Sequence, residues 1–132
     1  MRKIIQRPQY LNQLKRLKDK QIIKVITGIR RCGKSTLFNI FCDYLLDSGI
    51  SEKQIIRINL ENPDYHEIKD YLSLYNLIND QLQKDEQNYI FIDEVQNVPD
   101  FQKAIDGLFI KENCDVYITG SNAYLLSGEL AT

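Results

Sequence analysis

The stretch Val25-Ile-Thr-Gly-Ile-Arg-Arg-Cys-Gly-Lys-Ser35 decides the fold. Its last eight residues match the pattern G-x-x-x-x-G-K-[ST], in which a glycine-rich loop surrounds a phosphate with backbone N–H groups. Gly28 and Gly33 permit backbone angles that larger side chains forbid. Lys34 supplies a positive charge for the β- and γ-phosphates, and Ser35 supplies a hydroxyl ligand for Mg²⁺. The stretch therefore predicts a nucleotide phosphate site between a strand and a helix.

Four more side chains belong to this predicted loop. Thr36 can reach the α-phosphate at the start of a helix, whose N-terminal end attracts anions. Arg30 and Arg31 can contact a phosphate or the base, or else solvent or an acidic neighbour. Cys32 is either a small filler residue or, as a hypothesis, a reactive thiol beside a helix N-terminus whose alkylation would block nucleotide binding. The pattern alone separates neither ATP from GTP nor an ATPase from a kinase.

Outward from the loop, segments typical of strands alternate with segments typical of helices. This alternation predicts a parallel sheet covered by helices, with ligands bound at the carboxyl ends of the strands. Apolar, β-branched runs mark the strands, and apolar side chains at helical spacing mark the helices. The strands are predicted at residues 22–27, 55–60, 89–92 and 115–119, and the helices are predicted to begin at Pro8, Lys34, Tyr71 and Pro99.

The third predicted strand ends in two acidic residues, Asp93 and Glu94. Asp93 would hold Mg²⁺, directly or through water. Glu94 would orient and polarise an attacking water as a general base. The alternative is a strand that simply ends in solvated acids. Together with the phosphate loop, the pair favours hydrolysis over phosphoryl transfer to a metabolite.

The other strand ends carry further polar residues. Ser121 and Asn122 follow the fourth strand, where a polar side chain could sense the γ-phosphate or hold the attacking water. Asn122 is the preferred candidate, and a simple turn is the alternative. Glu61 follows the second strand and is a further candidate acid. His66 is expected in a surface loop.

Composition sets the broad class. The chain has 132 residues, of which 43% are hydrophobic and 27% charged, as in a soluble globular domain. No apolar run approaches the ~20 residues that cross a bilayer, so no membrane partner is expected. Three cysteines, without paired metal-ligand spacing, argue against a disulfide framework or a zinc site and favour the cytoplasm. A single histidine argues against His-based catalytic triads.

The small net charge hides an asymmetry. Residues 1–36 hold eleven Lys and Arg and one acid, a net of +10, whereas residues 37–132 hold six Lys and Arg and seventeen acids, a net of −11. A basic block indicates a polyanionic partner (a nucleotide phosphate, nucleic acid or a membrane surface), or else a solvated basic face. No helix-turn-helix, RNP or zinc-finger pattern accompanies it.

In these motifs the sequence resembles the AAA-type ATPases of bacteria and archaea that carry a second, C-terminal domain of poorly understood function. The likeness covers nearly the whole chain, and the run from Asp93 to Pro99 is its most family-specific part. The matching stretches are residues 10–11, 25–35, 90–99, 118–127 and 129–132.

The resemblance implies an α/β P-loop NTPase fold, a three-layer sandwich with a mostly parallel sheet of strand order 5-1-4-3-2. It also implies Walker A and Walker B motifs, Mg²⁺-dependent ATP hydrolysis and a cytoplasmic location. By position, Lys34 and Ser35 carry over as the phosphate and metal contacts. Asp93 carries over as the metal-binding acid and Glu94 as the catalytic acid, and Asn122 matches the sensor position.

The end of the chain departs from the family pattern. Members continue with a Gly-Arg segment, a fifth strand and the C-terminal domain, whereas this chain stops at Thr132. We therefore expect an N-terminal portion: a basic helix over residues 1–20 and an incomplete ATPase core over residues 21–132. Such a core would bind ATP yet hydrolyse it poorly, with its own C-terminal domain as a missing partner. A nucleotide-gated switch and a nucleic-acid-binding module remain alternatives. The sequence pattern identifies no oligomeric interface.

Overall fold

In a computed structural model of the protein, the described residues are 3–4, 10–26 and 31–120, with side chains described over residues 11–26 and 37–120. Strands and helices alternate along this part of the chain, with three short 3-10 turns between them. The order is β1 (Lys3–Ile4), α1 (Tyr10–Leu17), β2 (Lys24–Ile26), α2 (Arg31–Asp47), η1 (Glu52–Gln54), β3 (Ile55–Asn59), η2 (Pro63–Tyr65), α3 (Tyr71–Asn79), β4 (Asn88–Asp93), η3 (Val95–Asn97), α4 (Phe101–Phe109) and β5 (Cys114–Thr119).

The strands form one parallel sheet of order β1-β2-β5-β4-β3. The four strands predicted from sequence therefore lie in the order first, fourth, third, second, which confirms the predicted fold class. The edge beside β2, where the resemblance puts a fifth strand, is occupied in the described residues by β1. Two residues are too short to show a strand period, so the sequence did not predict β1. The division of the chain between residues 20 and 21 stays a prediction.

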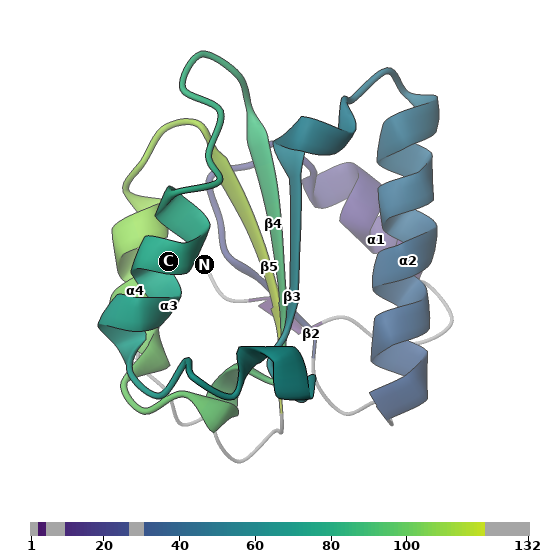
Figure 1. Cartoon of the computed structure of the whole chain (residues 1–132). Coiled ribbons are helices and arrows are strands. Elements are labelled where there is room, and N and C mark those ends of the chain that lie inside the picture. Colours follow the sequence, from purple (N-terminus) through teal and green to yellow (C-terminus); the bar gives the residue numbers. More distant parts are fainter. Residues whose placement is uncertain (1–2, 5–9, 27–30, 121–132) are drawn as a thin grey trace.

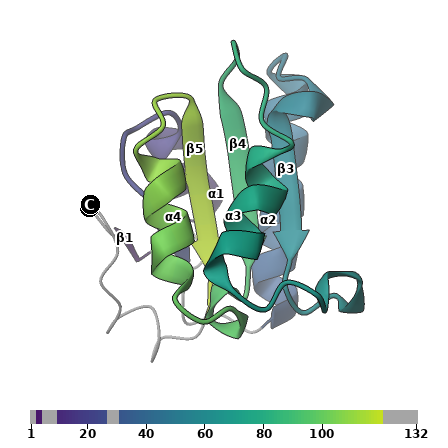
Figure 2. The ribbon, with the colours of Figure 1, turned by 60° about the vertical axis from the view of Figure 1, so that its left-hand side comes forward.

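The sheet lies between two layers of helices (Figure 1). Helices α1 and α2 cover one face, and α3 and α4 cover the other, as the turned view also shows (Figure 2). Strand β4 displays the underlying alternation, because Tyr89 and Phe91 face α1 and α2 whereas Ile90 and Ile92 face α3 and α4. All four side chains are buried, as expected for a strand covered on both faces.

Aromatic side chains hold α2 against the sheet. Phe91 and Tyr117 stack with ring centroids 4.7 Å apart, and Phe38 of α2 meets Phe91 edge-on at 5.1 Å. The apolar side chains of α2 that pack against the sheet are buried, including Phe38, Phe41 and Leu45. This packing brings the first turn of α2 to the same end of the molecule as the carboxyl ends of β3, β4 and β5 (Figure 1).

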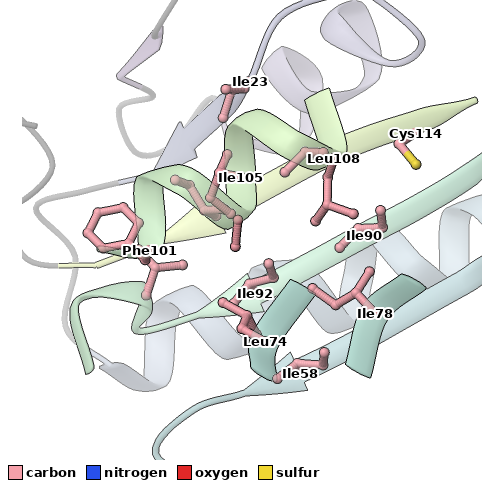
Figure 3. Packing of buried hydrophobic residues seen from close by; sticks show 14 of the residues in the cluster. Ile23, Ile58, Leu74, Ile78, Ile90, Ile92, Phe101, Ile105, Leu108 and Cys114 are labelled. Carbon is pink, nitrogen blue, oxygen red and sulfur yellow. The ribbon is translucent and has the colours of Figure 1, made fainter. Parts of the chain in front are cut away.

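On the other face, aliphatic side chains fill the space between helices and sheet (Figure 3). Ile105 and Leu108 of α4 pack together with Ile78 of α3 over the sheet, where Ile90 and Ile92 project from β4. Burying side chains of this size stabilises the fold by about 1.5–3 kcal/mol each. This layer also includes Val95 and Val98 and so anchors the chain that follows β4.

Helix α1 is described from Tyr10 onward, and its predicted start at Pro8 lies outside the described residues. Two other helix starts differ from the predicted ones. Helix α2 begins at Arg31, three residues before the predicted start at Lys34. The first N–H groups of a helix need no intrahelical partner, so the apolar period, which begins only at Leu37, does not fix the start. Helix α4 begins at Phe101 and not at Pro99, because Asp100 has a left-handed backbone (φ 58°) that cannot continue a helix.

Candidate nucleotide and metal site

The predicted phosphate loop is only partly described by the structure. Gly28 and Arg30 lie outside the described residues, and so do Ser121 and Asn122. The backbone from Arg31 onward belongs to α2. The side chains of Arg31, Cys32, Lys34, Ser35 and Thr36, and the contacts of Gly33, lie outside the description as well, so their roles stay predictions.

Asp93, the predicted metal-binding acid, is the last residue of β4 and is 2% exposed. It lies on the sheet face covered by α2, in phase with Phe91. Each of its carboxylate oxygens has a donor: the Thr119 hydroxyl donates to Oδ1 at 3.0 Å, and Arg57 Nη2 lies 3.3 Å from Oδ2. The structure thus places a buried, oriented carboxylate at the carboxyl edge of the sheet.

Burial dominates the acidity of this carboxyl group. Desolvation raises the pKa of Asp93 above its ordinary value, and the neighbouring charge of Glu94 adds to the rise. The hydrogen bond from Thr119 and the charge of Arg57 act in the opposite direction. A divalent cation would favour the ionised form in the same way as Arg57 does.

Thr119 is a site residue that the sequence did not reveal. It is the last residue of β5 and fully buried, and its hydroxyl both donates to Asp93 and accepts from the Glu94 N–H at 3.1 Å. The register pairs Ile92 with Ile118, so Asp93 and Thr119 are the next neighbours along the two strands. One hydroxyl therefore fixes the predicted metal acid and the backbone of the predicted general base.

Glu94 turns the chain at the end of β4. Its backbone is left-handed (φ 59°, ψ 51°), which costs an ordinary L-residue about 1–2 kcal/mol. The side chain is 7% exposed, and its Oε1 accepts a hydrogen bond from Gln96 Nε2 at 2.8 Å. The expectation that the strand ends at the acid pair is confirmed, whereas the catalytic role of Glu94 stays a prediction.

Arg57 is a second residue that sequence reasoning missed. It projects from β3, and its guanidinium joins Asp93 to Asn39 of α2 while lying over the Phe38 ring. It thereby ties α2, the helix that follows the predicted phosphate loop, to Asp93, the predicted metal-binding acid. Arg57 also lines a shallow groove of about 500 Å³ between α2 and β3, and Asp93 is not among its lining residues.

The remaining sequence candidates lie at the periphery. Glu61 follows β3 at the same edge of the sheet and is exposed, with its N–H bonded to Asn59 Oδ1 at 3.0 Å. His66 is exposed at the end of η2, as expected. In the basic block, Lys15 is on the surface, whereas Lys24 is fully buried and paired with Asp115. Lys24 thus belongs to no solvated basic face.

The donor set at Asp93 fits magnesium. Within residues 11–26 and 37–120, no three His, Cys, Asp or Glu side chains gather in a way that could hold a metal ion. Mg²⁺ does not need such a cluster, because it is usually held by one or two oxygen ligands, substrate phosphates and water. Asp93 with the hydroxyl of Ser35 would meet that requirement.

Fold and site together define a class. A parallel sheet with the phosphate-loop sequence after β2, and with a buried acid ending β4 two strands away, is the core of a P-loop NTPase. The comparison with protein families identifies the branch: the AAA domain family matches residues 20–132. The chain belongs to this AAA-type ATPase family, and it is a nucleotide-binding, ATPase-like module.

Two proteins of similar sequence have names that state no function. The chain is 44% identical to an uncharacterised protein of Haemophilus influenzae over 130 residues, 98% of this chain and 32% of that protein. It is 34% identical to an uncharacterised protein of Methanocaldococcus jannaschii over 115 residues, 83% of this chain and 23% of that protein. The chain thus spans a third or less of the length of these relatives. The search of solved structures gave no significant match. Among the described helices, none has the length and apolar character needed to span a membrane.

Proposed function

We propose that this chain is the ATP-binding, Mg²⁺-dependent hydrolytic core of a two-domain AAA-type protein, in which hydrolysis drives or times a motion of a C-terminal domain. The observation that carries the proposal is the joint fixation of Asp93 and Glu94 by Thr119, next to a strand that leads into a phosphate-loop sequence. The greater length of the two relatives supports the presence of a further domain.

In this proposal the phosphate loop binds the triphosphate. Backbone N–H groups between Gly28 and Gly33 surround the β-phosphate, and Lys34 neutralises charge on the β- and γ-phosphates. Ser35 and Asp93 would hold the Mg²⁺ ion, which supplies charge stabilisation to the phosphates when bound. Thr36 contacts the α-phosphate. Arg30, Arg31 and Cys32 complete the loop.

Glu94 performs the proton transfer. A water oxygen forms a bond to the γ-phosphorus, the bond to the bridging β–γ oxygen breaks, and Glu94 accepts the proton that the water gives up. The products are ADP and phosphate, and Asn122 at the neighbouring strand end senses the γ-phosphate. Most of the acceleration comes from positioning, because there is little covalent chemistry for the protein to perform.

A cytoplasmic location forms part of the proposal, since ATP is supplied there and free thiols persist. Cys42 and Cys114 are both free in the structure. A nucleic acid or protein partner is compatible with the exposed basic residues of α1, such as Lys15 and Arg16. Salt-dependent binding of nucleic acid that survives Lys34→Ala would establish such a partner independently of the nucleotide site.

The decisive experiment compares Glu94→Gln with wild type in the full-length protein. The variant should bind ATP with Mg²⁺ within about threefold of wild type and lose at least about 100-fold in turnover. Glu52→Gln is the matched control, because Glu52 is an exposed glutamate at the opposite end of β3. Equal turnover in Glu94→Gln and wild type would remove Glu94 from its role. A wild type that binds ATP without any turnover would favour the nucleotide-gated switch.

A further inference from the structure

We propose that Gln96 is a second catalytic residue, which holds the attacking water together with Glu94. The inference rests on the proposed ATP hydrolysis and deepens it. In this arrangement the water donates one hydrogen to the Glu94 carboxylate and the other to the amide oxygen of Gln96. The two acceptors together orient a lone pair of the water toward the γ-phosphorus.

The orientation of the Gln96 amide is set by its neighbour. Gln96 Nε2 donates to Glu94 Oε1 at 2.8 Å. An ionised carboxylate only accepts hydrogen bonds, so the NH₂ group of the amide must face Glu94. The amide oxygen of Gln96 is therefore the terminal atom that does not contact Glu94.

That oxygen is the unusual atom of the site. Gln96 Oε1 is buried and has no hydrogen-bond partner in the described part of the chain. Nearly all buried polar atoms in native proteins are paired, and an unpaired one costs about 1–3 kcal/mol. A buried acceptor beside a catalytic carboxylate calls for a donor, and the hydrolytic water is a donor that the reaction itself supplies.

The distances allow one water to reach both groups. The two terminal atoms of an amide are about 2.3 Å apart, so Gln96 Oε1 lies within about 5 Å of Glu94 Oε1. A water that donates two hydrogen bonds of about 2.8 Å joins acceptors separated by about 4.5 Å. The pair thus has the span of a two-point water clamp.

The turn that carries Gln96 is held at both ends. Val95 and Val98 are buried in the aliphatic layer under α3 and α4, with 0% and 1% of their surfaces exposed. The Asn97 N–H donates to the Glu94 carbonyl at 3.1 Å, and the Glu94 N–H is held by Thr119. The Gln96 backbone therefore has little freedom to move relative to Glu94.

In the reaction, one hydrogen of the water passes to Glu94 as a proton while the oxygen bonds to the γ-phosphorus. The other hydrogen stays on that oxygen and keeps its bond to Gln96 Oε1. The bond to the bridging oxygen of ADP breaks, so atoms and charge balance without a further reactant. Gln96 takes no proton, and it acts by fixing the direction of attack.

The test uses Gln96→Met in the full-length protein, since methionine keeps the length of the side chain and removes both hydrogen bonds. The matched control is Asn97→Ala, an exposed residue of the same turn. Phosphate release gives kcat, calorimetry gives the Kd for Mg·ATP, and thermal unfolding gives Tm. We expect kcat to fall about 100-fold in Gln96→Met with Kd within about threefold of wild type, and both to stay within about threefold in the control.

A second measurement keeps the inference falsifiable if turnover is slow. ADP with aluminium fluoride mimics the γ-phosphoryl group with water in line, so Gln96→Met should weaken that complex about tenfold or more while leaving ADP binding unchanged. An unchanged kcat would overturn the role of Gln96, and so would a fall in kcat matched by an equal fall in the affinity for Mg·ATP. Equal affinities of variant and wild type for the fluoride complex would also overturn it. Failure of the proposed function is seen separately, as absence of turnover in wild type.

Discussion

Replacing Thr119 by valine tests how the site is held together. Valine has nearly the same shape as threonine, so no cavity forms, but the hydroxyl that joins Asp93 to the Glu94 N–H is lost. A hydrogen bond to a charged group contributes about 1.5–3 kcal/mol, and a buried N–H left unpaired costs about 1–3 kcal/mol. Since the two effects share one hydroxyl, we expect a loss of about 3 kcal/mol in the free energy of unfolding.

Such a loss is a large share of the 5–15 kcal/mol by which proteins of this kind are usually stable. Urea unfolding followed by circular dichroism measures this loss. The slope of the unfolding free energy against urea concentration should be the same in both proteins, so that the change is one of stability alone. Thr119→Ser is the control, because serine keeps the hydroxyl and removes one buried methyl group, worth about 1 kcal/mol. A valine variant within about 1 kcal/mol of wild type, or a serine variant less stable than the valine one, would refute the reasoning.

Two further predictions concern buried charges. Lys24→Met should cost about 3–5 kcal/mol in the free energy of unfolding, because it leaves the buried carboxylate of Asp115 without its cation; thermal or urea unfolding checks this, and a loss below about 1 kcal/mol would contradict it. Burial raises the pKa of Asp93, so the folded state binds that proton more tightly than the unfolded chain does, and wild type should gain stability relative to Asp93→Asn as the pH falls through the raised pKa toward the ordinary value. Unfolding curves of both proteins at several pH values test this, and a stability difference that is independent of pH would speak against it.

The sequence was sufficient for the layout of the sheet. Apolar strands ending in Asp93 and Thr119 alternate with amphipathic helices, and a chain of that kind has few ways to bury both faces of a parallel sheet. The position of Asp93 at a carboxyl edge followed from the same pattern. The two-residue strand β1 and the starts of α2 and α4 did not follow from it, because none of the three is set by an apolar period.

The side-chain contacts of the site could not be predicted from the sequence. Arg57 and Thr119 reach Asp93 from strands that are distant in sequence, and only the register between strands brings them together. Gln96 is two residues from Glu94, but its hydrogen bond depends on the left-handed backbone at Glu94. A non-glycine residue with that backbone has no reliable signature in a sequence. The burial of Lys24 was hidden for a related reason, since its partner Asp115 is distant in sequence and lies beside it only because β5 pairs with β2.

The central claim is that the phosphate loop and Asp93 bind one Mg·ATP between them. Calorimetric titration of wild type and Asp93→Asn with ATP, each with and without Mg²⁺, tests it most directly, with Lys34→Ala as the control that lacks the loop cation. We predict that Mg²⁺ strengthens ATP binding to wild type and has a much smaller effect in Asp93→Asn, whereas Lys34→Ala binds weakly in either case. Absence of ATP binding to wild type, or an equal Mg²⁺ effect in wild type and Asp93→Asn, would contradict the claim.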